Sequence, residues 1–278
     1  MNRDDVRRVR RRGVYVIPTS LTVLNIFFGF MAILLSFRGM QATVLGDNAE
    51  AAHLFQRACW SLLVAAVFDT FDGLVARLMN ATSEFGKEYD SLADVVTFGA
   101  APAILVYSWS LHVWGRLGGG IAFLFLVAGS LRLARFNIST AKVDHRYFIG
   151  LPIPAGALTI ASIINYAPSP VTDPGFAAVM LVVTAGLAFA MVSTVRYRSQ
   201  KYANLQKERS FAYVIVLALM LVIFYRWPEE FLFVSAISYV VSGPLLKLWS
   251  IAFPAVPAGP SHPDDGDVVA SEAAVNAT

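Results

Sequence analysis

The stretch ACWSLLVAAVFDTFDGLVAR, residues 58–77, decides the fold of this 278-residue chain. It is apolar from Ala58 to Phe68 except for Ser61, and it then carries two acids, Asp69 and Asp72. A run of about 20 mostly apolar residues is long enough to cross a lipid bilayer as a helix. Ionisable side chains inside such a helix are costly and mark functional sites. The stretch therefore predicts a membrane-spanning helix with a functional site at one end.

The composition of the whole chain points to the same class of protein. Hydrophobic residues make up 56% of the chain and charged residues only 15%, whereas a soluble domain is typically about 25% charged. The single cysteine, Cys59, excludes an internal disulfide and a multi-cysteine zinc site. The four histidines are scattered and have no metal-ligand spacing. A soluble enzyme, a zinc module and a disordered chain fit poorly, and an integral membrane protein remains.

Hydropathy predicts an all-α, polytopic membrane bundle of about eight helices. The predicted spans run roughly over residues 15–37, 52–79, 90–113, 118–138, 151–168, 173–195, 210–226 and 229–250. The connections are short and contain helix breakers, namely Gly118-Gly119-Gly120, Pro168-Ser169-Pro170 and Trp227-Pro228. Three regions follow: a basic N-terminal segment (1–14), a transmembrane domain (15–250), and an acidic, proline-rich tail (251–278) that we expect to be disordered.

Lysine and arginine predict the orientation of these helices. With eight spans, eighteen basic residues fall on one side of the membrane and four on the other. The basic side is expected to be cytoplasmic, which places both termini in the cytoplasm and the protein in the cell membrane. The run Arg7–Arg12 serves as this topology signal or also attracts anionic lipid head groups. No nucleic-acid partner is expected, because the basic residues lie between apolar runs rather than on one solvated face.

A second pair of acids follows the first across a short connection. Asp69 and Asp72 are three residues apart, and Asp90 and Asp94 are four apart, so each pair lies on one face of its helix. Four carboxylates that converge in a partly desolvated place need compensating charge. One or two divalent cations would supply it, and ligands that are all oxygen suit Mg²⁺, Mn²⁺ or Ca²⁺. The alternative is ion pairing with basic residues such as Arg77 and Lys87.

Small residues lie beside the first acidic pair. Gly73 and Ala76 leave room for a flat group such as a nucleobase, or they allow tight helix packing. Arg77 is a suitable phosphate partner, or its side chain reaches to the membrane surface. A cation transporter is the alternative from another class, because acids inside a membrane can line ion pathways.

The pattern Asp69-x2-Asp72-Gly73-x2-Ala76-Arg77-x8-Gly86-x3-Asp90-x3-Asp94 resembles the complete signature of the CDP-alcohol phosphatidyltransferases. The resemblance implies a membrane enzyme that uses a CDP-linked lipid and two metal ions, Mg²⁺ or Mn²⁺, with Ca²⁺ as a possible non-productive ligand. It implies that the four aspartates hold the metals and that Asp94 is also the general base. It implies a CDP-lipid site made of Gly73, Ala76, Arg77, Ser83 and Gly86, together with Thr22 and Asn25 of the segment that begins at Pro18. Homodimers are common in this family, so a homodimer is expected.

Three further stretches are similar to the branch of the family that uses serine as the acceptor alcohol. They are residues 90–103, 131–137 and 147–155. The expected reaction transfers the phosphatidyl group from CDP-diacylglycerol to L-serine, with inositol phosphate or glycerol 3-phosphate as alternative acceptors. Arg132 and Arg135, three residues apart, would bind the serine carboxylate or the lipid phosphate. The positive-inside rule alone would also explain them.

Overall fold

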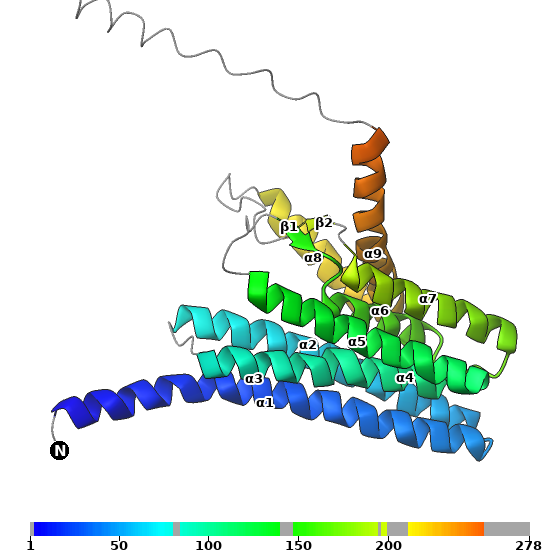
Figure 1. Cartoon of the computed structure of the whole chain (residues 1–278), viewed down its shortest axis with the longest axis horizontal. Coiled ribbons are helices and arrows are strands. Elements are labelled where there is room, and N and C mark those ends of the chain that lie inside the picture. The colour runs from blue at the N-terminus through cyan, green and yellow to red at the C-terminus, as the bar shows by residue number, and fades with distance from the viewer. Residues whose placement is uncertain (1–2, 80–83, 140–146, 194–195, 199–210, 253–278) are drawn as a thin grey trace, which may run out of the picture. The chain divides into compact units, whose positions relative to one another are not determined.

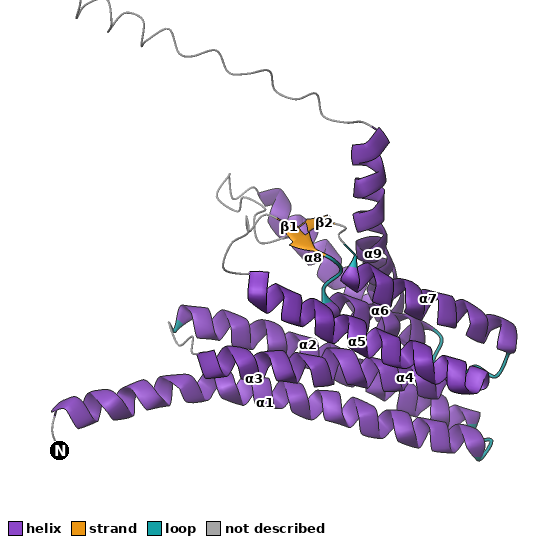
Figure 2. Cartoon of the chain, viewed as in Figure 1, coloured by secondary structure: helices purple, strands orange, loops and turns teal. Residues whose placement is uncertain are grey.

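The computed structural model describes residues 3–79, 84–139, 147–193, 196–198 and 211–252. The described chain is helical almost throughout, and Figure 2 shows one small pair of strands as the exception. Two units can be distinguished, residues 1–244 and residues 245–278, and the boundary falls at Pro244 inside the last helix.

The first two helices form an antiparallel hairpin along one side of the first unit (Figure 1). They are α1 (Arg3–Val44) and α2 (Asn48–Leu78). Gly46 makes the tight turn with a φ of 81°, and the Asp47 side chain caps α2 by accepting a hydrogen bond of 3.0 Å from the Glu50 amide. Near the other end of the hairpin, the rings of Phe28 and Phe68 stack with centroids 5.6 Å apart. This contact fixes α1 beside the segment of α2 that carries Asp69.

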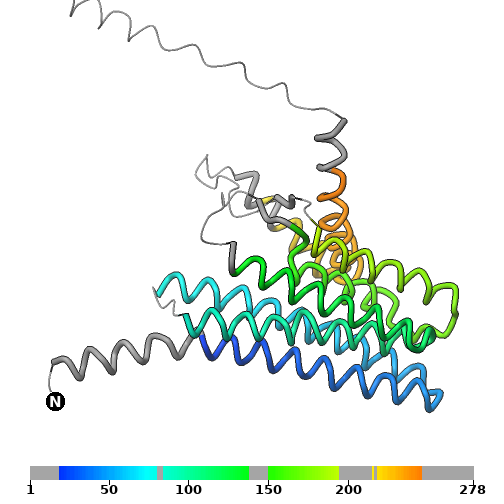
Figure 3. Tube along the Cα trace, viewed as in Figure 1, coloured from blue at the N-terminus to red at the C-terminus, as the bar shows by residue number. Residues whose placement is uncertain are grey.

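The third span is one continuous helical path (Figure 3), and its middle part is a π-helix. It consists of α3 (Glu84–Asp94), the π-helix η1 (Val95–Ala100) and α4 (Ala101–Trp109). Gly29 of α1 allows η1 to approach α1 closely. A Cβ atom added at Gly29 would lie only 2.9 Å from the Cα atom of Thr97 in η1. The π-helix begins directly after Asp94 and was not predicted from the sequence.

The fourth span corrects one expectation about the glycines. A 3₁₀ turn, η2 (Leu111–Trp114), leads into α5 (Gly115–Ser139), so Gly118-Gly119-Gly120 lies within the helix and does not break it. A Cβ atom added at Gly118 would collide with the backbone carbonyl of Leu111. The missing side chain at Gly118 therefore permits close packing of η2 on α5, which explains this glycine without a loop.

The next two helices are shorter, and one short strand precedes the first of them and another follows the second. α6 (Ile153–Tyr166) and α7 (Pro174–Val192) follow, and the connection between them contains the expected Pro168-Ser169-Pro170. Strand β1 (Tyr147–Ile149) pairs antiparallel with β2 (Arg196–Arg198). The expectation of an all-α protein therefore holds for the long elements and misses this strand pair.

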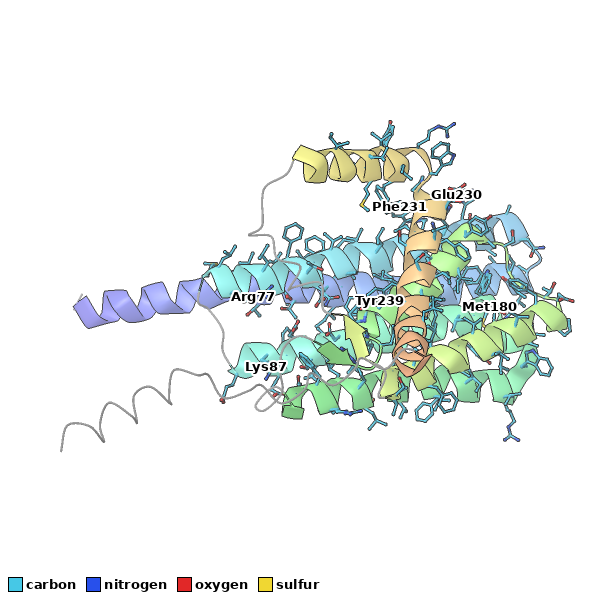
Figure 4. The ribbon with its side chains drawn as sticks, turned by 90° about the horizontal axis from the view of Figure 1, so that it is seen from above. Arg77, Lys87, Met180, Glu230, Phe231 and Tyr239 are labelled. Atoms are coloured by element: carbon cyan, nitrogen blue, oxygen red, sulfur yellow. The ribbon has the colours of Figure 1, made fainter. Side chains whose placement is uncertain are left out.

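The last helices are α8 (Phe211–Arg226) and α9 (Pro228–Ala252). Pro228 begins α9, as the Trp227-Pro228 break predicted. In both Figure 1 and Figure 4, the part of α9 that belongs to the first unit, residues 228–244, runs across the direction of α1, α2 and α5. The described side chains of α8 are almost all exposed, including Leu219, Leu221 and Tyr225.

The core of the first unit lies among α1, α2, α4, α5, α6 and α7. Its largest fully buried side chains include Phe55, Phe98, Trp109, Phe125 and Ile153. Within the described residues, five helices are long and apolar enough to cross a membrane, namely residues 19–44, 48–78, 84–109, 111–137 and 174–192. The length and composition of these helices identify an integral membrane protein.

Candidate active site

Three of the predicted aspartates meet where the end of α2 lies beside α3. Asp69 and Asp72 project from α2 and Asp90 from α3, and one carboxylate oxygen of each lies within 4.8 Å of the others. Asp72 is buried, and the other two are partly buried. Oxygens that bind one Mg²⁺ ion at about 2.1 Å lie roughly 3–4 Å apart. The three carboxylates are therefore close to the spacing that one cation requires.

Asp94, one turn after Asp90, joins this group through Asp69. The two carboxyl groups are within hydrogen-bonding range of each other. Two carboxylates can approach in this way only with a shared proton or with a cation beside them. Within the described residues, one buried oxygen (Oδ1) of Asp90 and one of Asp94 have no hydrogen-bond partner. Such buried acceptors fit a divalent cation, and the fully oxygen-based donor set favours a hard ion.

Helix α1 supplies two polar residues to the same place. The Thr22 hydroxyl donates a 2.8 Å hydrogen bond to Oδ2 of Asp72, which orients that carboxylate. Asn25 is fully buried, and neither its amide nitrogen nor its amide oxygen has a partner in the part of the chain that the structure describes. The Asn25 backbone carbonyl accepts a 3.3 Å hydrogen bond from Thr97 in η1. The π-helix thus holds α1 in register beside the aspartates.

The residues predicted to contact CDP differ in exposure, from the buried Thr22 and Asn25 to the exposed Gly73. Gly73 is exposed, and a Cβ atom added there would meet nothing within 4 Å. This finding favours open space over tight helix packing at Gly73. Ala76 and Gly86 are partly buried. Ser83 lies outside the described residues.

Arg77 does not act as the counter-ion that the ion-pairing alternative needs. Its side chain is exposed, and its Nε donates a 2.9 Å hydrogen bond to the Gly73 carbonyl one turn earlier. Lys87 is also exposed. Figure 4 shows both at the same end of the helices, Arg77 on α2 and Lys87 near the start of α3.

The two arginines of α5 differ in the structure, although nothing in the sequence distinguishes them. Arg132 is partly buried, interacts electrostatically with Asp94, and lies 5.6 Å from the centroid of the Phe136 ring. Its Nε is buried without a hydrogen-bond partner in the described chain. Arg135 is exposed. The structure therefore brings Arg132 to the aspartates and leaves Arg135 at the surface.

Three residues near the site were not singled out from the sequence as functional. Asn137 of α5 donates a 2.9 Å hydrogen bond to the Ser91 hydroxyl, which in turn donates to the Lys87 carbonyl. This chain ties α3 to α5 beside Asp90. The third residue is Thr97, whose contact with α1 depends on the π-helix. Ser91, Thr97 and Asn137 belong to stretches noted for their resemblance, but a spacing pattern alone does not indicate their contacts.

The model of the CDP-alcohol phosphatidyltransferase family matches residues 15–192, which include all four aspartates. This chain belongs to that family. Members of the family depend on a divalent metal, in agreement with the cluster of carboxylates.

The names of three relatives all refer to serine. The chain is 34% identical over 231 residues to a CDP-diacylglycerol–serine O-phosphatidyltransferase of Helicobacter pylori, covering 83% of this chain and 90% of that protein. It is 34% identical over 181 residues to the Bacillus subtilis protein of the same name, covering 65% and 89%. It is 35% identical over 183 residues to an archaetidylserine synthase of Methanothermobacter thermautotrophicus, covering 65% and 69%. The lipid part of the name varies, and serine is common to all three.

Proposed function

We propose that this protein transfers the phosphatidyl group of CDP-diacylglycerol to the hydroxyl of L-serine, which gives phosphatidylserine and CMP. The observation that carries the proposal is the similarity to serine O-phosphatidyltransferases over 90% of the length of one relative. The aspartate cluster supplies the matching chemistry, because displacement at phosphorus commonly uses carboxylate-bound metal ions.

The four aspartates have two roles in this proposal. Asp69, Asp72, Asp90 and Asp94 hold two divalent ions, Mg²⁺ or Mn²⁺. When bound, the ions neutralise the diphosphate of the donor and the charge on the departing CMP. Asp94 accepts the proton of the serine hydroxyl, the serine oxygen forms a bond to the lipid-bearing phosphorus, and the bond from that phosphorus to the CMP oxygen breaks. The protein contributes mainly the positioning of the reactants and a fixed electrostatic environment.

The donor nucleotide is proposed to lie over the open side of α2. Gly73 and Ala76 leave its backbone accessible, and Arg77 lies where a phosphate would emerge. Support for this placement comes from Asn25, whose buried amide has both a donor and an acceptor to offer to a cytosine ring. Thr22, Gly86 and Ser83 complete the proposed CDP-lipid site, and Arg132 and Arg135 are proposed to bind the acceptor or a phosphate.

The finer architecture is also a proposal. It comprises eight membrane-spanning helices, the domain limits 1–14, 15–250 and 251–278, cytoplasmic termini and active site, residence in the cell membrane, and a homodimer. Five helices of spanning length support the membrane part. Reporter tags at the two termini should both be accessible from the cytoplasm, and a periplasmic C-terminal tag would overturn the even number of spans.

An acceptor panel tests the proposed reaction directly. The full chain, in micelles with CDP-diacylglycerol and Mn²⁺ or Mg²⁺, is given L-serine, inositol phosphate or glycerol 3-phosphate, and CMP release is measured. Serine should give the fastest release and yield phosphatidylserine. Faster release with either phosphorylated alcohol would overturn the choice of acceptor. Metal-dependent ion flux without CMP release from any acceptor would favour a transporter.

A further inference from the structure

Helix α9 contacts three other helices in succession along its length. Glu229 accepts a 2.8 Å hydrogen bond from Gln56 of α2. Phe233 stacks on Tyr166 of α6 with ring centroids 5.0 Å apart. Tyr239 packs against the core and interacts electrostatically with Arg132 of α5. These contacts agree with the crossing direction of α9 in Figure 4, where Tyr239 lies on the side of α9 toward Arg77 and Lys87.

Arg132 is a neighbour of both Tyr239 and the aspartates. It interacts electrostatically with Asp94 and with Tyr239, and its guanidinium carbon lies 5.6 Å from the centroid of the Phe136 ring. Its Nε is buried without a partner in the described chain, and a buried donor that is left unsatisfied is costly. A guanidinium group offers a planar set of donors that matches a carboxylate. An acceptor molecule that carries a carboxylate would satisfy this group.

A carboxylate fits the positive charge of Arg132 beside Asp94. Arg132 interacts electrostatically with Asp94, and its other neighbour, Tyr239, has a neutral hydroxyl. A carboxylate is satisfied by one arginine and one further donor. The hydroxyl and carboxylate of serine are only a few bonds apart. A carboxylate held at Arg132 therefore leaves the serine hydroxyl within reach of Asp94.

We propose that Tyr239 of α9 and Arg132 of α5 together form the carboxylate subsite for the serine acceptor. Arg132 makes the ion pair, and the Tyr239 hydroxyl donates a hydrogen bond to the same carboxylate. The inference rests on the proposed function and deepens it. It assigns acceptor selectivity to a helix that lies beyond residues 15–192, the part that matches the family model.

The test is the Tyr239→Phe variant of the full chain. It removes one hydroxyl and keeps the ring that packs against the core. KM for serine should rise about 10- to 150-fold, the effect of one hydrogen bond to a charged group. KM for CDP-diacylglycerol and kcat should stay within about twofold. The preference for serine over serinamide, which lacks the carboxylate charge, should fall by a similar factor.

A matched control separates recognition from the docking of α9. Phe233→Leu weakens the contact of α9 with Tyr166 and leaves the Tyr239 hydroxyl in place, so KM for serine should not change. An equal rise of KM for serine in Phe233→Leu would make the effect of Tyr239 purely structural and overturn the inference. The inference is also overturned if Tyr239→Phe raises both KM values equally or leaves both unchanged.

Arg132→Lys gives a second, independent measurement. It keeps the positive charge and loses the planar set of donors, so KM for serine should rise at least as much as in Tyr239→Phe. In the double variant, the two increases should be less than multiplicative, because both groups bind one carboxylate. Fully multiplicative increases would indicate separate roles and would contradict a shared subsite.

Failure of the proposed function can be told from failure of this inference. If the wild-type protein releases CMP with another acceptor and not with serine, the proposed function itself fails. If it uses serine and these variants behave as wild type, only this inference fails.

Discussion

The two halves of the third span differ sharply in what they bury. In α3, which carries Asp90 and Asp94, the buried residue is Ala93, and Leu92 is 66% exposed. In α4, seven of nine residues are buried, among them Trp109 with no exposed surface. One half of the helix therefore anchors the bundle, and the other carries the partly buried carboxylates of Asp90 and Asp94. The packed half holds the helix that carries these carboxylates in place.

The π-helix η1 lies at the junction of these halves. A π-helix changes the register of the residues that follow it, and such segments are frequent at functional sites. Here η1 turns Thr97 toward α1, where it donates to the Asn25 carbonyl. The difference between α3 and α4 predicts that substitutions in α3 affect catalysis with little loss of stability. Substitutions in α4 should lower stability with little effect on catalysis.

The largest expected effect is on catalysis in the α3 half. Asp94→Asn removes the proposed base, so the rate of CMP release should fall about 100- to 10,000-fold. The midpoint of thermal unfolding should stay the same or rise, because one of several clustered negative charges is lost. The same exchange at Asp173, which caps α7 through the Phe176 amide, should leave turnover unchanged. Near-normal turnover in Asp94→Asn would contradict the assignment of the base.

The reverse pattern is expected in the α4 half. Trp109→Ala empties a fully buried site and removes the 2.8 Å hydrogen bond from Nε1 to the Ser169 carbonyl. The free energy of unfolding should fall by about 3–5 kcal/mol, measured by thermal or denaturant unfolding in micelles. The fraction that remains folded should keep its turnover rate within a few-fold. Trp114→Ala, at a side chain that is 40% exposed, should lower the free energy of unfolding much less. Equal losses in the two variants would contradict the anchoring role of α4.

The helices and the aspartate pairs could be predicted because each follows from a local rule. Long apolar runs predicted the helices, as in 173–195 against α7 at Pro174–Val192, which is one of the five described helices long and apolar enough to cross a membrane. Spacings of three and four residues placed each pair of acids on one face, and a short connection brought α2 and α3 together. The convergence of Asp69, Asp72 and Asp90 is therefore a direct consequence of sequence periodicity.

What could not be predicted depends on contacts between distant segments. The choice between Arg132 and Arg135 is decided by how α5 rotates against α3 and α9, and the same two residues look alike in the sequence. The π-helix η1 is six residues long, too short for its hydrogen-bond pattern to leave a hydrophobic period. The sequence predicts a helix break at Gly118 because glycine is unfavourable in helices, whereas the structure shows that Gly118 allows close packing against Leu111.

A substitution at the junction should affect both halves at once. In Gly29→Val, the new Cβ atom would lie 2.5 Å from the Thr97 hydroxyl oxygen and 2.9 Å from the Thr97 Cα atom. Because a backbone atom has to move, the free energy of unfolding should fall by about 1–3 kcal/mol. Turnover should also fall, because η1 shifts. Gly186→Val in α7, where an added Cβ atom meets nothing within 4 Å, is the control for both measurements. Loss of stability at Gly29 with full turnover would show that η1 does not couple the two halves.

The smallest expected effect distinguishes two roles of Thr22. Thr22→Val keeps the size of the side chain and removes the hydroxyl that donates 2.8 Å to Asp72. If that bond orients a metal ligand, the concentration of Mn²⁺ at half-maximal CMP release should rise about tenfold, with KM for CDP-diacylglycerol unchanged at saturating metal. A rise in KM for CDP-diacylglycerol at saturating metal would instead assign Thr22 to the nucleotide. Thr22→Ser keeps the hydroxyl and should retain the metal dependence of the wild type, so the pair of variants isolates a single hydrogen bond between α1 and the carboxylate cluster.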